Sequence, residues 1–130
     1  MFFQILTSQS SFFAKNKEII LNNFKKKIRL EFIYNSNKIK KDASFVSVIS
    51  YYKKILPKDL KKNQNIFVIH ESNLPKGRGM SPLFNQILNG KEKIVTTIFR
   101  CNRNLDDGPI IYKKTFSYPK NLIYEEIKKF

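Results

Sequence analysis

The sequence predicts an α/β fold in which a largely parallel sheet is flanked by helices. Short apolar and β-branched segments alternate with a segment of helical periodicity along the 130 residues. This alternation is typical of parallel sheets, because parallel strands are joined by crossover connections. The continuous apolar run at residues 66–69 is typical of a strand buried on both faces, which is the position of a central strand.

The first half of the chain predicts three strands and one helix. Apolar residues predict a strand over 2–6, and apolar residues at near-helical spacing predict a helix over 12–27. Three lysines end that helix, where cations suit the helix dipole. A second strand is expected over 30–34, and the β-branched and aromatic residues of 45–51 form the strongest strand signal of this half.

The segments that follow contain proline and glycine at informative places. A proline limits residues 53–62 to a helical turn at most. Residues 82–89 predict a helix, with Ser81 as its cap, a proline at its first position and Gly90 just beyond its end.

The remaining elements complete the sheet. Strands are expected over 94–100 and 110–116, around a turn-rich segment, and an amphipathic helix over 121–130. In α/β proteins functional residues collect at the carboxyl ends of the strands. The candidate sites are therefore the loops that begin at Ser50, at His70 and at Arg100.

The charge balance raises nucleic acid as a partner, and the kind of basic residue argues against it. Lys and Arg number 25 against 10 Asp and Glu, a net charge of +15. Only four of these residues are arginine, the residue that proteins favour for phosphates and base edges. A solvated lysine surface is therefore favoured over a nucleic-acid footprint. Hydrophobic residues make up 42%, which excludes a disordered polybasic chain.

Other features bear on compartment and domain organisation. The apolar runs are far too short to span a bilayer, and the first seven residues lack the basic region of a signal peptide. The lack of a signal-peptide pattern, together with a single cysteine, Cys101, favours a cytoplasmic location. Cys101 and His70 are too few for a zinc site, so no metal is expected. No linker composition interrupts residues 1–130, which are expected to form one domain, with a shortened C-terminal end left open.

His70 is the only histidine, and it directly follows the apolar run 66–69. Residues 71–79 then form a polar loop that contains two glycines and an arginine. Glycine lets a ligand approach the backbone closely, and loops on a rigid scaffold are where sites are usually built. A lone histidine is otherwise more often a satisfied core or surface residue, so it is the loop that favours a site.

Four segments carry a family resemblance. Residues 50–57 are Ser-Tyr-Tyr-Lys-Lys-Ile-Leu-Pro, residues 70–82 are His-Glu-Ser-Asn-Leu-Pro-Lys-Gly-Arg-Gly-Met-Ser-Pro, residues 84–90 are Phe-Asn-Gln-Ile-Leu-Asn-Gly and residues 105–110 are Leu-Asp-Asp-Gly-Pro-Ile. In this order and spacing they resemble the catalytic-domain motifs of the folate-dependent formyltransferases. That family includes the methionyl-tRNA, glycinamide ribonucleotide and sugar-nucleotide enzymes. The resemblance implies a Rossmann-like core with a mostly parallel, twisted sheet.

The resemblance implies formyl transfer from 10-formyltetrahydrofolate to an amine, with His70 and Asp106 as catalytic residues. His70 would supply proton transfer or a contact to the oxyanion, and Asp106 would orient the histidine or handle protons. Taken alone, residues 106–109 are an ordinary turn. The family usually has asparagine two residues before this histidine, a candidate oxyanion donor, and this chain has Val68. A backbone amide, Ser72 or Asn73 would have to substitute.

Cofactor contacts in the family come largely from backbone atoms of the matching loops. The resemblance therefore implies that cofactor binding involves Ser50, Tyr51, Ile55, Leu74, Pro75, Gly77, Arg78, Gly79 and Gly108.

The acceptor is inferred from the loop 71–79 and from length. The loop resembles the sugar-nucleotide branch more closely than the tRNA branch, whose members carry a second domain for which 130 residues leave no room. The expected acceptor is a nucleotide-linked amino sugar used in surface polysaccharide synthesis, and a homodimer is left open. Two alternatives remain: a catalytically impaired module that binds folate or an anion, and methionyl-tRNA formylation.

Overall fold

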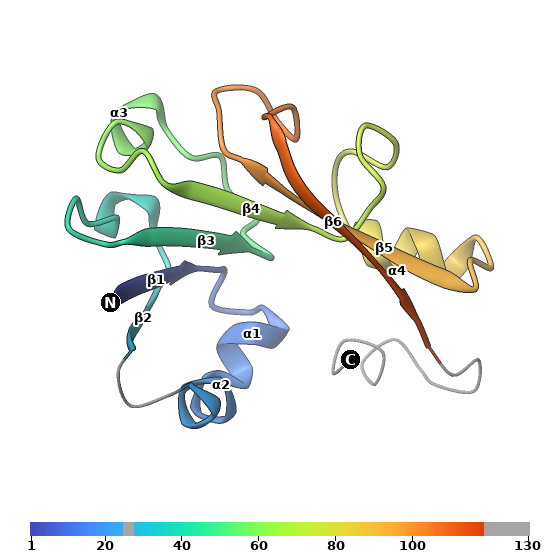
Figure 1. Ribbon diagram of the computed structural model, residues 1–130, viewed down its shortest axis with the longest axis horizontal. Helices are drawn as coiled ribbons and strands as arrows, with labels where there is room; N and C mark the ends of the chain where they lie inside the picture. The colour runs from blue at the N-terminus through green and yellow to red at the C-terminus, as the bar shows by residue number, and fades with distance from the viewer. Residues whose placement is uncertain (25–27, 119–130) are drawn as a thin grey trace.

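A computed structural model describes residues 1–24 and 28–118 of the chain, which contain one six-stranded sheet (Figure 1). The strand order is β2-β1-β3-β4-β5-β6. The strands are β1 (Phe2–Leu6), β2 (Arg29–Ile33), β3 (Phe45–Ile49), β4 (Ile66–His70), β5 (Lys93–Arg100) and β6 (Ile110–Ser117). The helices are α1 (Phe12–Lys15), α2 (Lys17–Asn23), α3 (Pro57–Leu60) and α4 (Pro82–Leu88), and a 3-10 turn, Ser36–Lys38, precedes β3.

The sheet is mostly parallel, as predicted. β2, β1, β3 and β4 pair in parallel, and β5 and β6 extend the sheet through antiparallel pairs. The direction changes between β4 and β5, which are joined by 22 residues that include α4. Figure 1 shows α1 and α2 beside the parallel half and α4 alongside β5.

The core lies against the parallel strands. Leu6 and Val46 are fully buried and pack with Val48 and Ile66. In β3 the buried valines alternate with half-buried residues, as expected where successive side chains point to opposite faces. The other face carries aromatic pairs such as Phe3 with Phe45, whose ring centroids are 4.1 Å apart.

Burial along β4 differs from the prediction. Only the two end residues of the strand are buried, and the three between them are half-buried. The prediction of a strand buried on both faces was therefore wrong. Val68 is only half-buried because it lines a cavity. Phe67 points to the opposite face of the sheet, where its neighbour is the Arg100 guanidinium, 5.9 Å from the centre of its ring.

The predicted helix over 12–27 is two short helices that meet at Asn16. The polar turn before them does open a helix, because the Ser11 hydroxyl accepts a hydrogen bond from the amide of Ala14. α2 ends at Asn23, and its last turn contains no basic residue, so the expected lysine-rich end was wrong. Residues 25–27 and the helix expected over 121–130 lie outside the described residues. Within those residues no helix is long and apolar enough to cross a membrane.

α4 begins and ends close to its predicted bounds, but its start is unusual. Ser81 precedes Pro82 as expected, yet it has φ 51° and ψ 46° and its side chain forms no capping hydrogen bond. Ser81 therefore occupies the N-cap position as predicted, but its side chain does not cap the helix. Gly90, with φ 65°, follows the end of the helix as predicted.

The antiparallel direction of β5 corrects the expected position of its carboxyl end. The register pairs Arg100 with Phe67 and Thr97 with His70. The loop that begins after Arg100 therefore starts at the opposite edge of the sheet from His70. The prediction that it starts at the same edge as the loops after Ser50 and His70 was wrong. The loop turns back before β6, and Asp106 within it reaches His70.

Candidate active site

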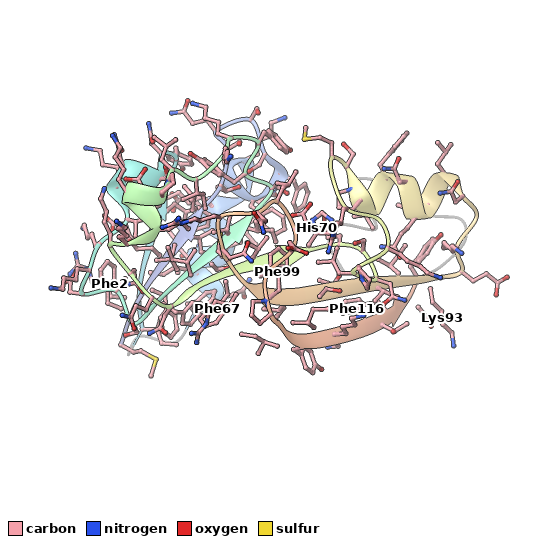
Figure 2. All side chains as sticks on the ribbon, turned by 90° about the horizontal axis from the view of Figure 1, so that it is seen from above. Phe2, Phe67, His70, Lys93, Phe99 and Phe116 are labelled. Atoms are coloured by element: carbon pink, nitrogen blue, oxygen red, sulfur yellow. The ribbon has the colours of Figure 1, made fainter. Side chains whose placement is uncertain are left out.

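His70 ends β4 at the carboxyl edge of the parallel strands, near the centre of the molecule in Figure 2. Its side chain is buried, and the ring Nε2 lies 2.9 Å from the carbonyl oxygen of Gly77. A carbonyl only accepts hydrogen bonds, so Nε2 must carry the hydrogen. In the neutral ring Nδ1 then has a free lone pair, and it lies 3.8 Å from Asp106 Oδ1.

Asp106 is held in place by the loop that follows β4. Its Oδ2 accepts a hydrogen bond of 2.9 Å from the amide of Gly79, and its own φ is 50°. Gly77 therefore fixes the histidine and Gly79 fixes the aspartate. The structure brings the two expected catalytic residues together, and a single short loop positions both.

A small cavity of about 150 Å³ opens beside this pair. Its polar side chains are those of Ser50, Tyr51, Tyr52, His70, Glu71, Ser81 and Asp106. Among the described residues that line it there are two carboxylates and no lysine or arginine, although the chain has a net charge of +15. The cavity is therefore locally acidic within a basic protein.

A larger cavity of about 610 Å³ adjoins the first and shares Val48, Val68 and Asp106 with it. Phe99 and Cys101 add to its apolar wall. Three cations also line it: Lys53, Lys54 and Arg103. The two cavities thus differ in charge and meet at Asp106.

Strained backbone is concentrated at this site. In the described part of the chain three residues other than glycine have a positive φ, namely Ser50, Ser81 and Asp106. All three line the small cavity. Such conformations cost about 1–3 kcal/mol each and are retained where the surrounding structure enforces them, often at functional sites.

The residues expected to bind cofactor divide into two groups. Ser50, Tyr51, Ile55 and Gly79 line one or both cavities. The others lie outside the cavity walls: Leu74, Pro75, Gly77, Arg78 and Gly108. Three of them, Gly77, Arg78 and Gly108, make close contacts within and between the loops of the site.

Gly77 and Gly108 are sites of close approach. A Cβ at Gly77 would lie 2.9 Å from Ser72 Cβ, and one at Gly108 would collide with the carbonyl oxygen of Arg100. Arg78 donates a 2.6 Å hydrogen bond to Asp107, which joins the loop after β4 to the loop before β6. This pair is half exposed, so it contributes little energy but helps to keep the two loops together.

Ser72 and Asn73, the expected substitutes for an oxyanion donor, do not line either cavity. The buried Ser72 hydroxyl donates to the carbonyl of Lys76, and its carbonyl accepts from Thr97 Oγ1 at 2.7 Å. Asn73 Oδ1 accepts a hydrogen bond from Lys113. Both side chains therefore hold the loop in place.

The sequence did not reveal several lining residues. Glu71, Met80 and Ser81 lie within the motif at residues 70–82, but their side chains carry no sign of a binding loop as plain as that of the glycines beside them. Lys53, Lys54 and Leu105 lie within the other motifs, and Arg103 lies just before one. Their position in or beside a motif is the only sequence signal for these residues, because cavity lining depends on how the loops fold.

Cys101 contributes to the cavity wall as an apolar group. Burial, and after it the charge of Asp106, raises the pKa of its thiol to about 11. The thiolate is the reactive form, so this thiol is a poor nucleophile at neutral pH. Among the described residues no group of three or more His, Cys, Asp or Glu side chains is placed to hold a metal ion.

The fold and the site together define an α/β domain with a histidine–aspartate pair at the carboxyl end of a central strand. The chain belongs to the formyl transferase family, whose family model, Formyl transferase, matches residues 10–128. A methionyl-tRNA formyltransferase of Wolbachia sp. subsp. Drosophila simulans is 30% identical over 102 residues, covering 77% of this chain and 34% of the relative. This chain thus spans about a third of that protein's length.

Solved structures confirm the Rossmann-like fold. The methionyl-tRNA formyltransferase of Clostridium thermocellum superimposes with a TM-score of 0.72 at 23% identity, over 90% of this chain and 53% of that one. WlaRD, a sugar 3N-formyl transferase, superimposes with a TM-score of 0.63 at 17% identity, over 91% of this chain and 52% of that one. At these identities the likeness concerns the fold alone.

Proposed function

We propose that this chain transfers a formyl group from 10-formyltetrahydrofolate to a primary amine. The observation that carries the proposal is the pairing of His70 with Asp106 where an acidic cavity meets a basic one. Membership of the formyl transferase family and the names of the curated relatives support it.

The larger cavity suits the formyl donor. A folate has a flat, largely apolar ring system and an anionic tail, and about 610 Å³ is within the usual range for a small-molecule site. Val48, Val68 and Phe99 would contact the rings, while Lys53, Lys54 and Arg103 would attract the tail. When bound, 10-formyltetrahydrofolate supplies the formyl carbon.

The small cavity suits the amine. An amine approaches as its ammonium form, and the carboxylates of Glu71 and Asp106 would attract that charge. The amine must then lose a proton before its nitrogen can attack. Nδ1 of His70 has the free lone pair to take this proton, and Asp106 stabilises the resulting imidazolium.

The proposed reaction balances as follows. A bond forms between the acceptor nitrogen and the formyl carbon, and the bond from that carbon to the donor nitrogen breaks. The ammonium nitrogen loses two protons over the reaction, of which the donor nitrogen gains one and solvent takes the other. His70 is placed to hold the transferred proton between its loss from the acceptor and its gain by the donor.

Two classes of amine are candidates for the acceptor. A nucleotide-linked amino sugar is the acceptor expected from the loop 71–79, and the acidic cavity is compatible with its amine. Aminoacylated tRNA is favoured by the curated relatives, among them the methionyl-tRNA formyltransferases of Wolbachia and Rickettsia rickettsii. Chain length does not separate these acceptors, because the chain spans about a third of the length of these relatives.

The test supplies 10-formyltetrahydrofolate with a panel of dTDP- or UDP-amino sugars, or with charged initiator tRNA, and measures released tetrahydrofolate. We expect tetrahydrofolate to be released with one class of acceptor, and we expect this release to be lost in the His70→Ala variant. Folate binding without release, unaffected by His70→Ala, would contradict the enzymatic proposal and favour a binding module without turnover. A cytoplasmic location, a single domain over 1–130 and a homodimer remain predictions, and sedimentation tests the last.

A further inference from the structure

The turn at residues 102–108 carries two adjacent carboxylates that point in different directions. The Asp106 side chain is 9% exposed and faces His70, whereas the Asp107 side chain is 42% exposed. Asp107 lines neither cavity, so it does not reach a molecule bound in either of them. The shape of this turn therefore decides which of the two carboxylates meets the histidine.

The outward carboxylate closes the turn on itself. Asp107 Oδ2 accepts a hydrogen bond of 3.2 Å from the Asn104 side chain, and the Asp107 carbonyl accepts one of 3.3 Å from the Asn102 side chain. Asn102 Oδ1 in turn accepts a bond of 2.9 Å from the amide of Asn104. At the end of the turn, Gly108 lies so close to the carbonyl of Arg100 that a Cβ would collide with it. These contacts give the segment a defined shape.

Two consecutive links join this turn to the loop after β4. The Gly79 amide donates to Asp106 Oδ2 at 2.9 Å. The neighbouring Arg78 guanidinium donates to Asp107 Oδ1 at 2.6 Å. Adjacent residues of one loop thus bind adjacent residues of the other. Because both links act on the same stretch of backbone, a rotation of the turn that moved Asp106 away from His70 would also break the Arg78 bond.

Asp106 needs this support because its φ of 50° is an unfavourable conformation for a residue with a side chain. The Gly79 bond holds only the end of its carboxylate, while the bonds of Asp107 hold the backbone beside it. An isolated exposed ion pair contributes little stability, but the Asp107 carboxylate binds two side chains at once, one through a short charge-assisted bond. These bonds therefore act on the geometry of the turn more than on the stability of the protein.

We infer that Arg78 and Asp107 are positioning residues, which act through the turn to hold the carboxylate of Asp106 opposite Nδ1 of His70. This inference rests on the proposed function. Neither residue lines a cavity, so neither is a catalytic residue itself. The two adjacent aspartates thus have separate tasks, one facing the histidine and one anchoring the turn.

The first test removes the link between the loops in two backgrounds. Arg78→Ala and Asp107→Ala should each lower kcat about 10-fold, because a catalytic group that is slightly misplaced loses rate. In the Asp106→Asn background neither substitution should lower kcat further, because the carboxylate that they position is gone. The melting temperature should stay nearly unchanged, because the pair is half exposed.

Lys76→Ala and Asp42→Ala are the matched controls for the loss of a cation and of a carboxylate. Both residues are exposed and line neither cavity, so kcat should not change. If Asp107→Ala melts at a much lower temperature, Arg78→Ala decides, because it leaves the bonds within the turn intact. An unchanged kcat in Arg78→Ala, or an equal loss of kcat with and without the Asp106 carboxylate, would overturn the inference.

A readout without turnover uses the only histidine of the chain, His70. The ¹⁵N resonances of its ring report the charge and hydrogen bonding of each nitrogen, so Asp106→Asn should shift them. Arg78→Ala should shift them in the same direction, and Lys76→Ala should leave them in place. Ring resonances that stay unchanged in Arg78→Ala would overturn this inference alone. If the unmodified protein releases no tetrahydrofolate with either class of acceptor, the proposed function fails and this inference fails with it.

Discussion

The ring Nε2 of His70 lies 2.9 Å from the carbonyl oxygen of Gly77, so the loop after β4 determines which ring nitrogen meets Asp106. Because the carbonyl can only accept, the neutral ring keeps its hydrogen on Nε2 and leaves Nδ1 free. Gly77 has φ 75° and lies against Ser72, so its lack of a side chain is required for this contact.

Gly77→Ala should lower kcat because the new Cβ would lie 2.9 Å from Ser72 Cβ and would push the carbonyl away from His70. With that bond weakened the ring can place its hydrogen on either nitrogen, so the pH–rate profile should change as well. Steady-state kinetics across pH measure both effects.

Gly90→Ala is the matched control for backbone strain. Gly90 has φ 65°, and nothing lies within 4 Å of an added Cβ. The Gly90→Ala variant should lose about 1 kcal/mol of stability without any change in the pH–rate profile. If both variants change the profile equally, the contact between His70 and Gly77 is not what sets the reacting nitrogen.

Asp106→Asn should lower kcat about 10²-fold or more while the protein stays folded. Asparagine tolerates a φ of 50°, and its amide oxygen can still accept the Gly79 hydrogen bond. The variant therefore removes the charge that faces His70 and little else. Tetrahydrofolate release measures the effect, and full activity in this variant would show that the carboxylate is not needed.

Gln86→Leu should destabilise the protein by about 1 kcal/mol, because it leaves partly buried backbone groups unpaired. The Gln86 amide donates to the carbonyls of Glu71 and Val95 and accepts from the Val95 amide, which ties α4 to β5 and to the loop after His70. Urea denaturation measures the loss. Equal stability would mean that water replaces these bonds.

Acid should weaken the protein partly through Asp59, which joins α3 to the 3-10 segment. The ion pair with Lys62, supported by a hydrogen bond from Ser36, lowers the pKa of Asp59 from its usual 3.8, against the effect of burial. A lowered pKa in the folded state stabilises the protein above pH 3.8, and this contribution is lost as pH falls through the folded value.

The corresponding variant is Asp59→Asn. Its unfolding free energy should be lower than that of the unmodified protein at neutral pH, and the gap should shrink in acid as Asp59 takes up its proton. Urea unfolding at a series of pH values measures this. A gap that stays constant to low pH would rule out the charge of Asp59 as its cause.

The cations of the larger cavity should control the affinity for folate. Replacing Lys53, Lys54 and Arg103 together by glutamate should raise the KM for 10-formyltetrahydrofolate and weaken its dependence on salt. Lys41→Glu, at an exposed residue that lines neither cavity, is the control for a change in net charge. An equal KM in the triple variant would place the folate tail elsewhere.

Local sequence patterns determined the strands and the approximate helix bounds. The β-branched and aromatic residues of β3 are sufficient to predict a strand, because such side chains pack well on a pleated sheet. Pro57 and Gly90 mark the beginning or end of their helices through their own backbone preferences. His70 and Asp106 were found through motif resemblance, which requires no knowledge of distance.

Only the tertiary structure determines how His70 and Asp106 are oriented toward each other and what holds them there. The sequence did not show that β5 runs antiparallel to β4, because a strand pattern carries no direction. Nor did it show that Gly77 selects the ring nitrogen of His70, or that Ser81 precedes α4 in a left-handed conformation without a side-chain capping bond. These properties depend on contacts between loops that are distant in sequence, so they exist only once the chain has folded.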